Sequence, residues 1–418
     1  MTVPATVRDR RAELLMSAAN HRHGIVLKPQ LARTAMADMP GVWHVGVPQN
    51  GADAWRSAAG GVGRDIASAR LAAIGEALER YAAATCALTT RTRSQLAGEA
   101  IVAASEFSLF SAEQVAAPRF AFSSLYDDDA LYARAYSVDD NAPVWVPHDL
   151  VGLRGEDGLA TSSGLAAGTT SMRALLRAIE ELIERDALMI SWLHSIAGRQ
   201  VALPLHHADD VAALGGRVVC IDATPAYSPH PVALVAGSLP LRGRDRCSLG
   251  AACRATWEAA VEKAFLEWAQ GVYFVGEYLA HHPGLRFDSY DEVDTFDAHA
   301  VYYTTAPEEW AKVALLHGEP GTPAGDAPAA PTTARALEQL VRRLRDEGVR
   351  LYYRDLTTPD LRQVGLHAVR ALSPDLTPIY CHQRQPFLGG RTGDVLWRYP
   401  WAEPLRLRFP NPMPHPLG

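Results

Sequence analysis

The sequence predicts a mixed α/β fold, because helical and strand patterns alternate along most of its 418 residues. Segments rich in apolar and β-branched residues, bounded by turn residues, predict strands. We place these strands at residues 131–138, 142–151, 217–224, 230–239, 349–357 and 363–372. The clearest helix follows a run of small residues and repeats its apolar residues with a period of 3.6. Its apolar face consists of Leu175, Leu176, Ile179, Leu182 and Ile183. We therefore expect sheets flanked by long helices.

One local pattern occurs twice. Residues 57–80 and 162–185 each consist of a small-residue run, then a helical stretch, then the motif E-x-x-E-R. When the two copies are aligned, Gly63 falls on Gly168. Such internal similarity indicates a duplicated structural unit. We expect each small-residue run to be a loop whose backbone N–H groups are free to face an anion at the start of its helix. A hydroxyl side chain would cap the second helix, and the candidates are Thr169, Thr170 and Ser171.

The two motifs carry four carboxylates and two guanidinium groups. The residues are Glu76, Glu79, Arg80, Glu181, Glu184 and Arg185. Charges at this helical spacing usually form a solvent-exposed face, and an old duplication explains the repeat without a site. If the two helices converge, however, the four carboxylates repel one another unless cations lie between them. Mg²⁺ prefers oxygen ligands and commonly bridges carboxylates to nucleotide phosphates.

Composition excludes several classes of protein. The formal net charge of −7 argues against a nucleic-acid-binding surface. No apolar run is long enough for a transmembrane helix, and the N-terminus has charged residues where a signal peptide needs an apolar core. The five cysteines are scattered without a C-x-x-C pair, which favours reduced thiols in a cytoplasmic protein.

We divide the chain into a lead-in segment, residues 1–50, and one large domain, residues 51–418. Within the domain, a third predicted helix places Lys263, Glu267 and Gln270 on one face. A simple surface pair of lysine and glutamate is the alternative interpretation of that face. The segment 318–333 is rich in Pro, Gly and Ala and predicts a mobile loop.

The end of the chain, residues 405–418, is rich in proline. Proline recurs at every second position from Pro410 to Pro416, which favours an extended polyproline conformation. A disordered end is one interpretation. A stiff tail that docks into a groove, and so brings Gly418 to a fixed place at little entropic cost, is the other.

Together, these motifs resemble the YcaO family, and the ending PMPHPLG resembles its azoline-forming branch of peptide cyclodehydratases. The resemblance implies a YcaO-like fold in which the loop–helix pseudo-repeat surrounds an ATP and Mg²⁺ site. It implies that ATP phosphorylates a backbone amide oxygen of a ribosomal precursor peptide, so that a Cys, Ser or Thr residue closes to thiazoline or oxazoline. The implied Mg²⁺ ligands are Glu76, Glu79, Glu181 and Glu184. The implied nucleotide contacts are Ser162, Ser163, Arg80, Arg185, Lys263, Glu267 and Gln270. The tail residues implied in catalysis are Pro414, Pro416 and the Gly418 carboxylate, with Pro412 as a further candidate.

The chain departs from the family pattern at three positions. Val62 stands where a loop lysine is common, Ala72 where serine is common, and Ser163 where asparagine is common. We expect Arg64 to replace the missing lysine charge and to contact the nucleotide.

The resemblance also implies partners. We expect a separate E1-like protein that binds the leader of the precursor peptide, an FMN-dependent dehydrogenase that oxidises azoline to azole, and a homo-oligomer or hetero-complex. Two alternatives remain open. One is YcaO-type thioamide or amidine formation. If the protein forms azolines instead, deletion of residues 412–418 should abolish cyclisation. The other is a non-catalytic scaffold subunit. The departures from the family pattern at Val62 and Ser163 are compatible with it.

Overall fold

The computed structural model describes residues 5–32, 38–39, 41–48, 57–153, 159, 161–403 and 407–418. Its helices are α1 (Ala5–Ala18), α3 (Ile66–Thr85), α4 (Ala112–Ala116), α5 (Ser171–Leu193), α6 (Leu205–Ala213), α7 (Trp257–His281), α8 (Phe296–Thr305), α9 (Pro307–Trp310), α10 (Thr333–Asp346), α11 (Pro359–Gln363) and α12 (Val395–Arg398). Its strands are β1 (Gln30–Leu31), β2 (Trp43–Pro48), β3 (Ser57–Gly63), β4 (Thr90–Thr92), β5 (Leu131–Ser137), β6 (Pro143–Pro147), β7 (Leu165–Gly168), β8 (Arg199–Val201), β9 (Arg217–Asp222), β10 (Val232–Leu241), β11 (Arg244–Cys253), β12 (Glu319–Pro320), β13 (Tyr352–Asp355) and β14 (His367–Leu372).

The described strands form three sheets. The first has the order β1-β2-β3, the second β11-β10-β9-β8-β12, and the third β4-β5-β13-β14-β7, with β6 paired to β5. Almost all pairs are antiparallel, and β12 with β8 is the parallel exception among the named strands. The mixed α/β prediction is therefore confirmed. Three strands, β3, β7 and β11, each lie at an edge of their sheet.

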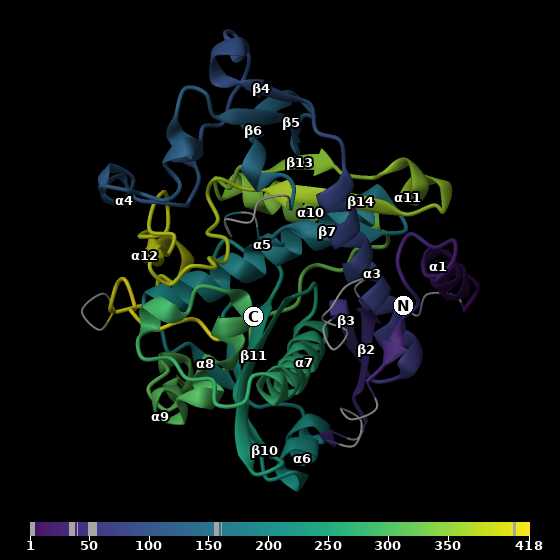
Figure 1. Ribbon diagram of the computed structural model, residues 1–418, viewed down its shortest axis with the longest axis vertical. Helices are drawn as coiled ribbons and strands as arrows, with labels where there is room; N and C mark the ends of the chain where they lie inside the picture. The colour runs from purple at the N-terminus through teal and green to yellow at the C-terminus, as the bar shows by residue number, and fades with distance from the viewer. Residues whose placement is uncertain are drawn as a thin grey trace.

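Three helices fill the spaces between these sheets (Figure 1). Each follows one of the edge strands directly: α3 follows β3, α5 follows β7 and α7 follows β11. Helix α3 packs on β3 and also on β7, α5 packs on β7 and also on β11, and α7 packs on β11 and also on β3. The sequence showed two copies of a unit, and the structure contains three strand–helix units that meet around a common centre.

Much of each small-residue run is a strand, β3 in the first run and β7 in the second, so our prediction of loops is wrong for those residues, while residues 162–164 and 169–170 lie outside the strands. Glycine in β3, and likewise in β11, lets a helix approach its own strand closely. A Cβ atom on Gly61 would lie 2.2 Å from the Ala69 carbonyl oxygen, and one on Gly250 would lie 2.1 Å from the Ala264 carbonyl oxygen. Side chains of any size would push α3 and α7 away from the sheets. The small residues therefore reflect close packing rather than an open anion-binding loop.

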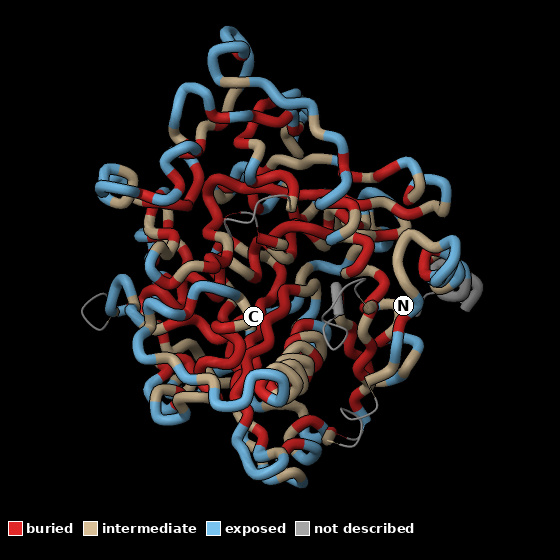
Figure 2. Tube along the Cα trace, viewed as in Figure 1, coloured by how far each residue is buried: buried red, intermediate tan, exposed pale blue. Residues whose placement is uncertain are grey.

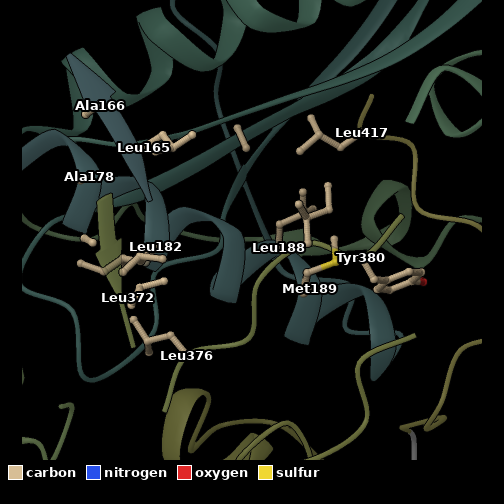
Figure 3. Packing of buried hydrophobic residues seen from close by; sticks show 14 of the residues in the cluster. Leu165, Ala166, Ala178, Leu182, Leu188, Met189, Leu372, Leu376, Tyr380 and Leu417 are labelled. Carbon is tan, nitrogen blue, oxygen red and sulfur yellow. The ribbon is translucent and has the colours of Figure 1, made fainter. Parts of the chain in front are cut away.

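Helix α5 is the centre of the core. Most of its residues from Ala174 onward are buried on all sides, because sheets cover two of its faces (Figure 2). Its start matches the prediction, since the Thr170 hydroxyl accepts a hydrogen bond from the Arg173 N–H at 3.2 Å. The main apolar cluster includes residues of α5, β7 and β14 and the penultimate residue, Leu417 (Figure 3).

Most other predicted elements are present, with boundaries that move by a few residues. The segment 318–333 is largely coil, and it contacts the body of the protein through the Ala324 N–H, which donates to Asp222, and the Ala327 N–H, which donates to the Ala255 carbonyl. The predicted division between residues 50 and 51 lies outside the described residues, so the lead-in segment and the domain remain predictions. None of the described helices combines the length and the apolar composition that a membrane span requires.

A buried ion pair fixes the C-terminal half of α5. The side chains of Asp186 and Arg398 are both 0% exposed and are joined by two hydrogen bonds of 2.7 and 2.8 Å. The Asp186 carboxylate also accepts hydrogen bonds from the Tyr227 hydroxyl at 2.7 Å and the Thr377 N–H at 2.8 Å. All four donors converge on one carboxylate, directly after Arg185 in the chain.

We expect Arg398→Met to destabilise the protein by about 3–5 kcal/mol, because it leaves the Asp186 charge buried without its partner. The change is measured as a lower urea midpoint. Arg384→Met is the matched control, since Arg384 and Asp291 form an exposed pair 4.0 Å apart, and it should cost no more than about 1 kcal/mol. Equal losses of stability in the two variants would contradict the view that the buried pair of Asp186 and Arg398 stabilises the fold.

Candidate active site

The two glutamates of α3 are held by the edges of two different sheets. The Gly60 N–H on β3 donates to Glu76 Oε2 at 3.1 Å, and the Ala167 N–H on β7 donates to Glu79 Oε1 at 2.9 Å. Both N–H groups belong to edge strands and have no strand partner on that side. Arg80 donates to Glu76 Oε1 at 2.6 Å and is half exposed. The α3 carboxylates therefore face the space between β3 and β7.

The second motif lies deeper. Glu181, with 20% of its side chain exposed, and Glu184, with 5%, both form ion pairs with Arg185, at 3.3 and 3.0 Å respectively. The Cys253 N–H on β11 donates to Glu184 Oε2 at 3.3 Å. The β11 edge of the second sheet thus contacts the second motif, as the β3 and β7 edges contact the first motif.

The carboxylates of the two motifs are close enough to affect one another's protonation. Burial raises the pKa of Glu79 to about 8, and the charges of Glu181 and Glu76 add to this rise. Burial also raises the pKa of Glu184, with further contributions from Glu267 and Glu181 that Arg185 partly offsets. The two motif helices therefore converge, as we expected, and bring their carboxylates to one place.

Helix α7 adds the third set of side chains. Lys263 pairs with Glu267 at 2.9 Å, and the charges of Lys263 and Arg185 outweigh burial and lower the pKa of Glu267. A Cβ atom on Gly60 would lie 2.7 Å from Gln270 Nε2. The predicted face of Lys263, Glu267 and Gln270 thus meets both the α5 motif and the β3 edge.

Two arginines at this centre were missed in the sequence. Arg254, directly after β11, lies 3.8 Å from Glu180. Burial lowers the pKa of Arg254, but the charges of Glu180, Glu184 and Glu267 outweigh burial and raise it. Arg370 on β14 donates to two backbone carbonyls, and burial lowers its pKa to about 10 while the charge of Glu181 partly offsets this. The position of Arg254 in the sequence could have indicated it, because Arg254 directly follows β11 as Arg64 directly follows β3.

Arg64 makes its polar contacts elsewhere. Its guanidinium donates to Glu262 at 3.0 Å and to Asp210 at 3.5 Å, and it contacts His207 Nδ1. The hydrogen bond from His207 and the charge of Arg64 lower the pKa of Glu262 to about 2. The ligand atoms of His206, His207 and Glu262 lie within 4.8 Å of one another, but the Arg64 cation already fills the space beside His207. Nucleotide contact by Arg64 stays a prediction, and a nucleotide would have to displace these partners.

Two of the three positions that depart from the family pattern, Val62 and Ser163, are buried, and the third, Ala72, is exposed. Val62 is 5% exposed and packs into the apolar cluster of α7. Ser163 is buried, and its hydroxyl accepts a hydrogen bond from the Thr161 hydroxyl at 2.9 Å, while Ser162 is partly buried before β7. Neither serine makes a described contact with the carboxylates, so their contact with a nucleotide stays a prediction.

The C-terminal tail is docked. Pro414, His415, Pro416 and Leu417 are buried, whereas Gly418 and the earlier residues 408–410 and 412 are exposed. The Tyr303 hydroxyl donates to the Pro414 carbonyl at 2.6 Å. Burial lowers the pKa of His415, and the Arg185 charge is among the further causes, so the tail passes near the converging motifs. The interpretation of a docked tail is confirmed over the described residues 407–418.

The residues at this centre suit a nucleotide with Mg²⁺. Arg185 Nη1 lies near Glu184, yet within the described residues neither it nor Nε makes a hydrogen bond, although both atoms are buried. Buried N–H groups of a guanidinium require acceptors, and phosphate oxygens match their geometry. The clustered carboxylate oxygens are the ligands that Mg²⁺ takes.

Comparisons with known proteins agree with this arrangement. The family model described as YcaO cyclodehydratase, ATP- and Mg²⁺-binding, matches residues 60–377. A heterocyclase solved in complex with substrate and cofactor superimposes with a TM-score of 0.74 at 18% identity, covering 96% of this chain and 57% of that chain. YcaO from Methanopyrus kandleri, bound with AMPPCP and Mg²⁺, gives a TM-score of 0.61 at 18% identity and covers 89% of each chain.

A third structure, the E. coli microcin synthetase McbBCD complex with pro-MccB17 bound, gives a TM-score of 0.64 at 15% identity, covering 94% of this chain and 98% of that chain. No significant match was found among curated protein sequences. The fold and the family match define the class as the ATP- and Mg²⁺-binding cyclodehydratases. Because the family model covers most of its length, the chain belongs to the YcaO family.

The raised carboxyl pKa values give a pH-dependent response to Mg²⁺. A folded-state pKa of about 8 for Glu79, above its ordinary 4.5, contributes stability that is complete below pH 4.5 and is lost as the pH rises through 8. Mg²⁺ binds the ionised form and replaces the lost protons. We therefore expect Mg²⁺ with ATP to raise the thermal midpoint more at about pH 8.5 than at about pH 6. The same comparison on Glu79→Gln should show a smaller pH dependence, and a shift of equal size at both pH values in the native protein would contradict this account.

Proposed function

We propose that this protein uses ATP to cyclodehydrate Cys, Ser or Thr residues in a ribosomal precursor peptide. The side-chain sulfur or oxygen loses its proton and adds to the preceding carbonyl carbon, and the former carbonyl oxygen takes the γ-phosphoryl group of ATP, releasing ADP. Loss of that oxygen as phosphate, with loss of the amide proton, leaves the C=N bond of thiazoline or oxazoline. The observation that carries the proposal is the convergence of three strand–helix units on one set of carboxylates and guanidinium groups.

When bound, Mg²⁺ supplies charge neutralisation for the triphosphate, and ATP supplies the phosphoryl group. Glu76, Glu79, Glu181 and Glu184 offer the oxygen ligands. Arg185 offers phosphate oxygens the N–H groups of Nε and Nη1, which make no hydrogen bond among the described residues, and Arg254 offers a second cation beside Glu180. The hydrogen bonds from β3, β7 and β11 keep the carboxylates in place before any ligand arrives.

The tail supports the azoline chemistry in particular. It passes close to Arg185, so groups near the end of the chain are within reach of a peptide bound beside the nucleotide. We assign Pro414 and Pro416 to fixing the tail, and the Gly418 carboxylate to positioning the amide or moving its proton.

The first test is magnesium-dependent ATP binding, measured by calorimetry on the protein alone. We expect Glu79→Gln and Glu181→Gln each to weaken this binding about 10- to 100-fold, because each removes a metal-binding oxygen charge. Glu338→Gln, on the exposed surface of α10, is the control and should bind as the unmodified protein does. Absence of saturable, magnesium-dependent ATP binding in the unmodified protein would favour the scaffold alternative.

The second test concerns partners. The microcin synthetase in the comparison is a complex of several proteins with its pro-peptide bound, which supports a separate leader-binding partner here. We expect the protein alone to convert a precursor peptide slowly and the partner to raise kcat/KM, with loss of the mass of one water per ring. Full turnover without a partner would overturn the partner requirement. ATP consumption that yields a thioamide or amidine would replace azoline formation.

A further inference from the structure

Two buried imidazole rings join the C-terminal tail to helix α8. The rings of His299 and His415 stack with their centroids 3.8 Å apart and their planes 3° from parallel. The exposed fraction of each residue is 0%. Tyr380 closes the edge of the pair, with its ring 4.8 Å from that of His415 and nearly perpendicular to it. Two stacked histidines in a dry environment are a specific arrangement that general apolar packing does not require.

Hydrogen bonds to backbone carbonyls fix the orientation of both rings. His299 Nδ1 lies 2.9 Å from the carbonyl oxygen of His415, and His299 Nε2 lies 2.8 Å from that of Cys381. His415 Nε2 lies 2.7 Å from the Tyr380 carbonyl oxygen. Because burial lowers the pKa of both imidazoles, each ring is neutral near pH 7 and carries one N–H. The tautomer of His299 therefore decides whether the ring donates to the tail or to residue 381.

The stack occurs where the tail approaches the active site. Upstream of it, the Trp192 indole donates to the Met413 carbonyl at 2.8 Å and the Gln383 amide donates to the Pro412 carbonyl at 2.8 Å. Downstream, Leu417 is buried in the main cluster, near Leu188, Met189 and Tyr380 (Figure 3). A Cβ atom on Gly418 would lie 2.6 Å from the Cβ of Ala300 on α8. The stack therefore lies between the part of the tail bound to α5 and its free end.

We propose that His299 and His415 are positioning residues, whose stacked pair sets where the last residues of the tail lie relative to the converging carboxylates. The proposal rests on the proposed function, because the positioned tail matters for peptide cyclisation. Neither imidazole reaches solvent, so neither touches a bound peptide, and both act through the backbone that follows His415. His415 Nδ1 has no hydrogen-bond partner among the described residues, so the ring is held by its stack and by a single N–H.

The test uses the full-length protein with its leader-binding partner, ATP and precursor peptide. His299→Gln removes the stacked ring, and His415→Phe keeps a stacked ring but removes the N–H to Tyr380. We expect kcat for cyclisation to fall about 100-fold in both, since small displacements of positioning groups have effects of that size. The affinity for ATP with Mg²⁺ should stay within about twofold of that of the unmodified protein, because neither substitution removes a group that binds the nucleotide in the ground state. His317→Gln, at an exposed histidine, should leave all values unchanged.

A second measurement keeps the proposal separate from the assigned reaction. Hydrogen exchange of the backbone amides in residues 411–418 should rise at least about 10-fold in the two variants, because the tail opens locally. Tyr303→Phe, which deletes only the hydroxyl bonded to Pro414, tests the tail without disturbing the stack and should raise exchange less.

If the tail exchanges faster but kcat is unchanged, the pair does not position a catalytic segment. If exchange is unchanged, the stack does not hold the tail. If the unmodified protein binds ATP but forms no azoline, the proposed function fails, and the exchange experiment still decides whether the stack holds the tail.

Discussion

The structure depends on one constraint, which is that three sheet edges meet at a point where no fourth strand can pair with them. The free N–H groups of Gly60, Ala167 and Cys253 must find acceptors, since buried backbone donors without partners are costly. Carboxylates from α3 and α5 accept these hydrogen bonds. Burial of these carboxylates raises the pKa of Glu79 and Glu184, and the charges of neighbouring glutamates add to the rise. A site for cations is thus a consequence of how the sheets end.

Helices α3, α5 and α7 hold the three sheet edges together. Each of α3, α5 and α7 lies close to the strand before it and also contacts a neighbouring unit, so the three units lock one another in place. Close approach depends on glycine at positions such as Gly61 and Gly250. Helix α5 has sheets on two of its faces, and the saturated carboxylate of Asp186 fixes it just beyond Arg185. The arginine that faces the cluster, Arg185, is therefore supported by a helix that is buried over most of its length.

The sequence predicted the α/β class, the duplicated motif and the third helix face, because periodic spacing and repeated residue types are local properties. It misled us about the small-residue runs, since glycine and alanine serve both loops and closely packed strands, and only the tertiary contacts of Gly61 and Gly250 distinguish them. Arg254 and Arg370 were missed because each is brought to the site by a strand, without a helical pattern to mark it. Arg64 has the charge we expected, but the position of α6 supplies it with His207 and Asp210, and no local pattern encodes that meeting.

The unpaired strand edges have a meaning beyond catalysis. An edge with free N–H groups is a template for pairing with another chain, and proteins commonly shield such edges with charge. Here the glutamates of α3 and α5 accept hydrogen bonds from the edges of β3, β7 and β11, so they also satisfy strand N–H groups that the fold would otherwise leave unpaired. A descendant that had lost all turnover would still be under selection to keep these acids. Their retention in a relative would therefore be poor grounds for inferring that the relative is active.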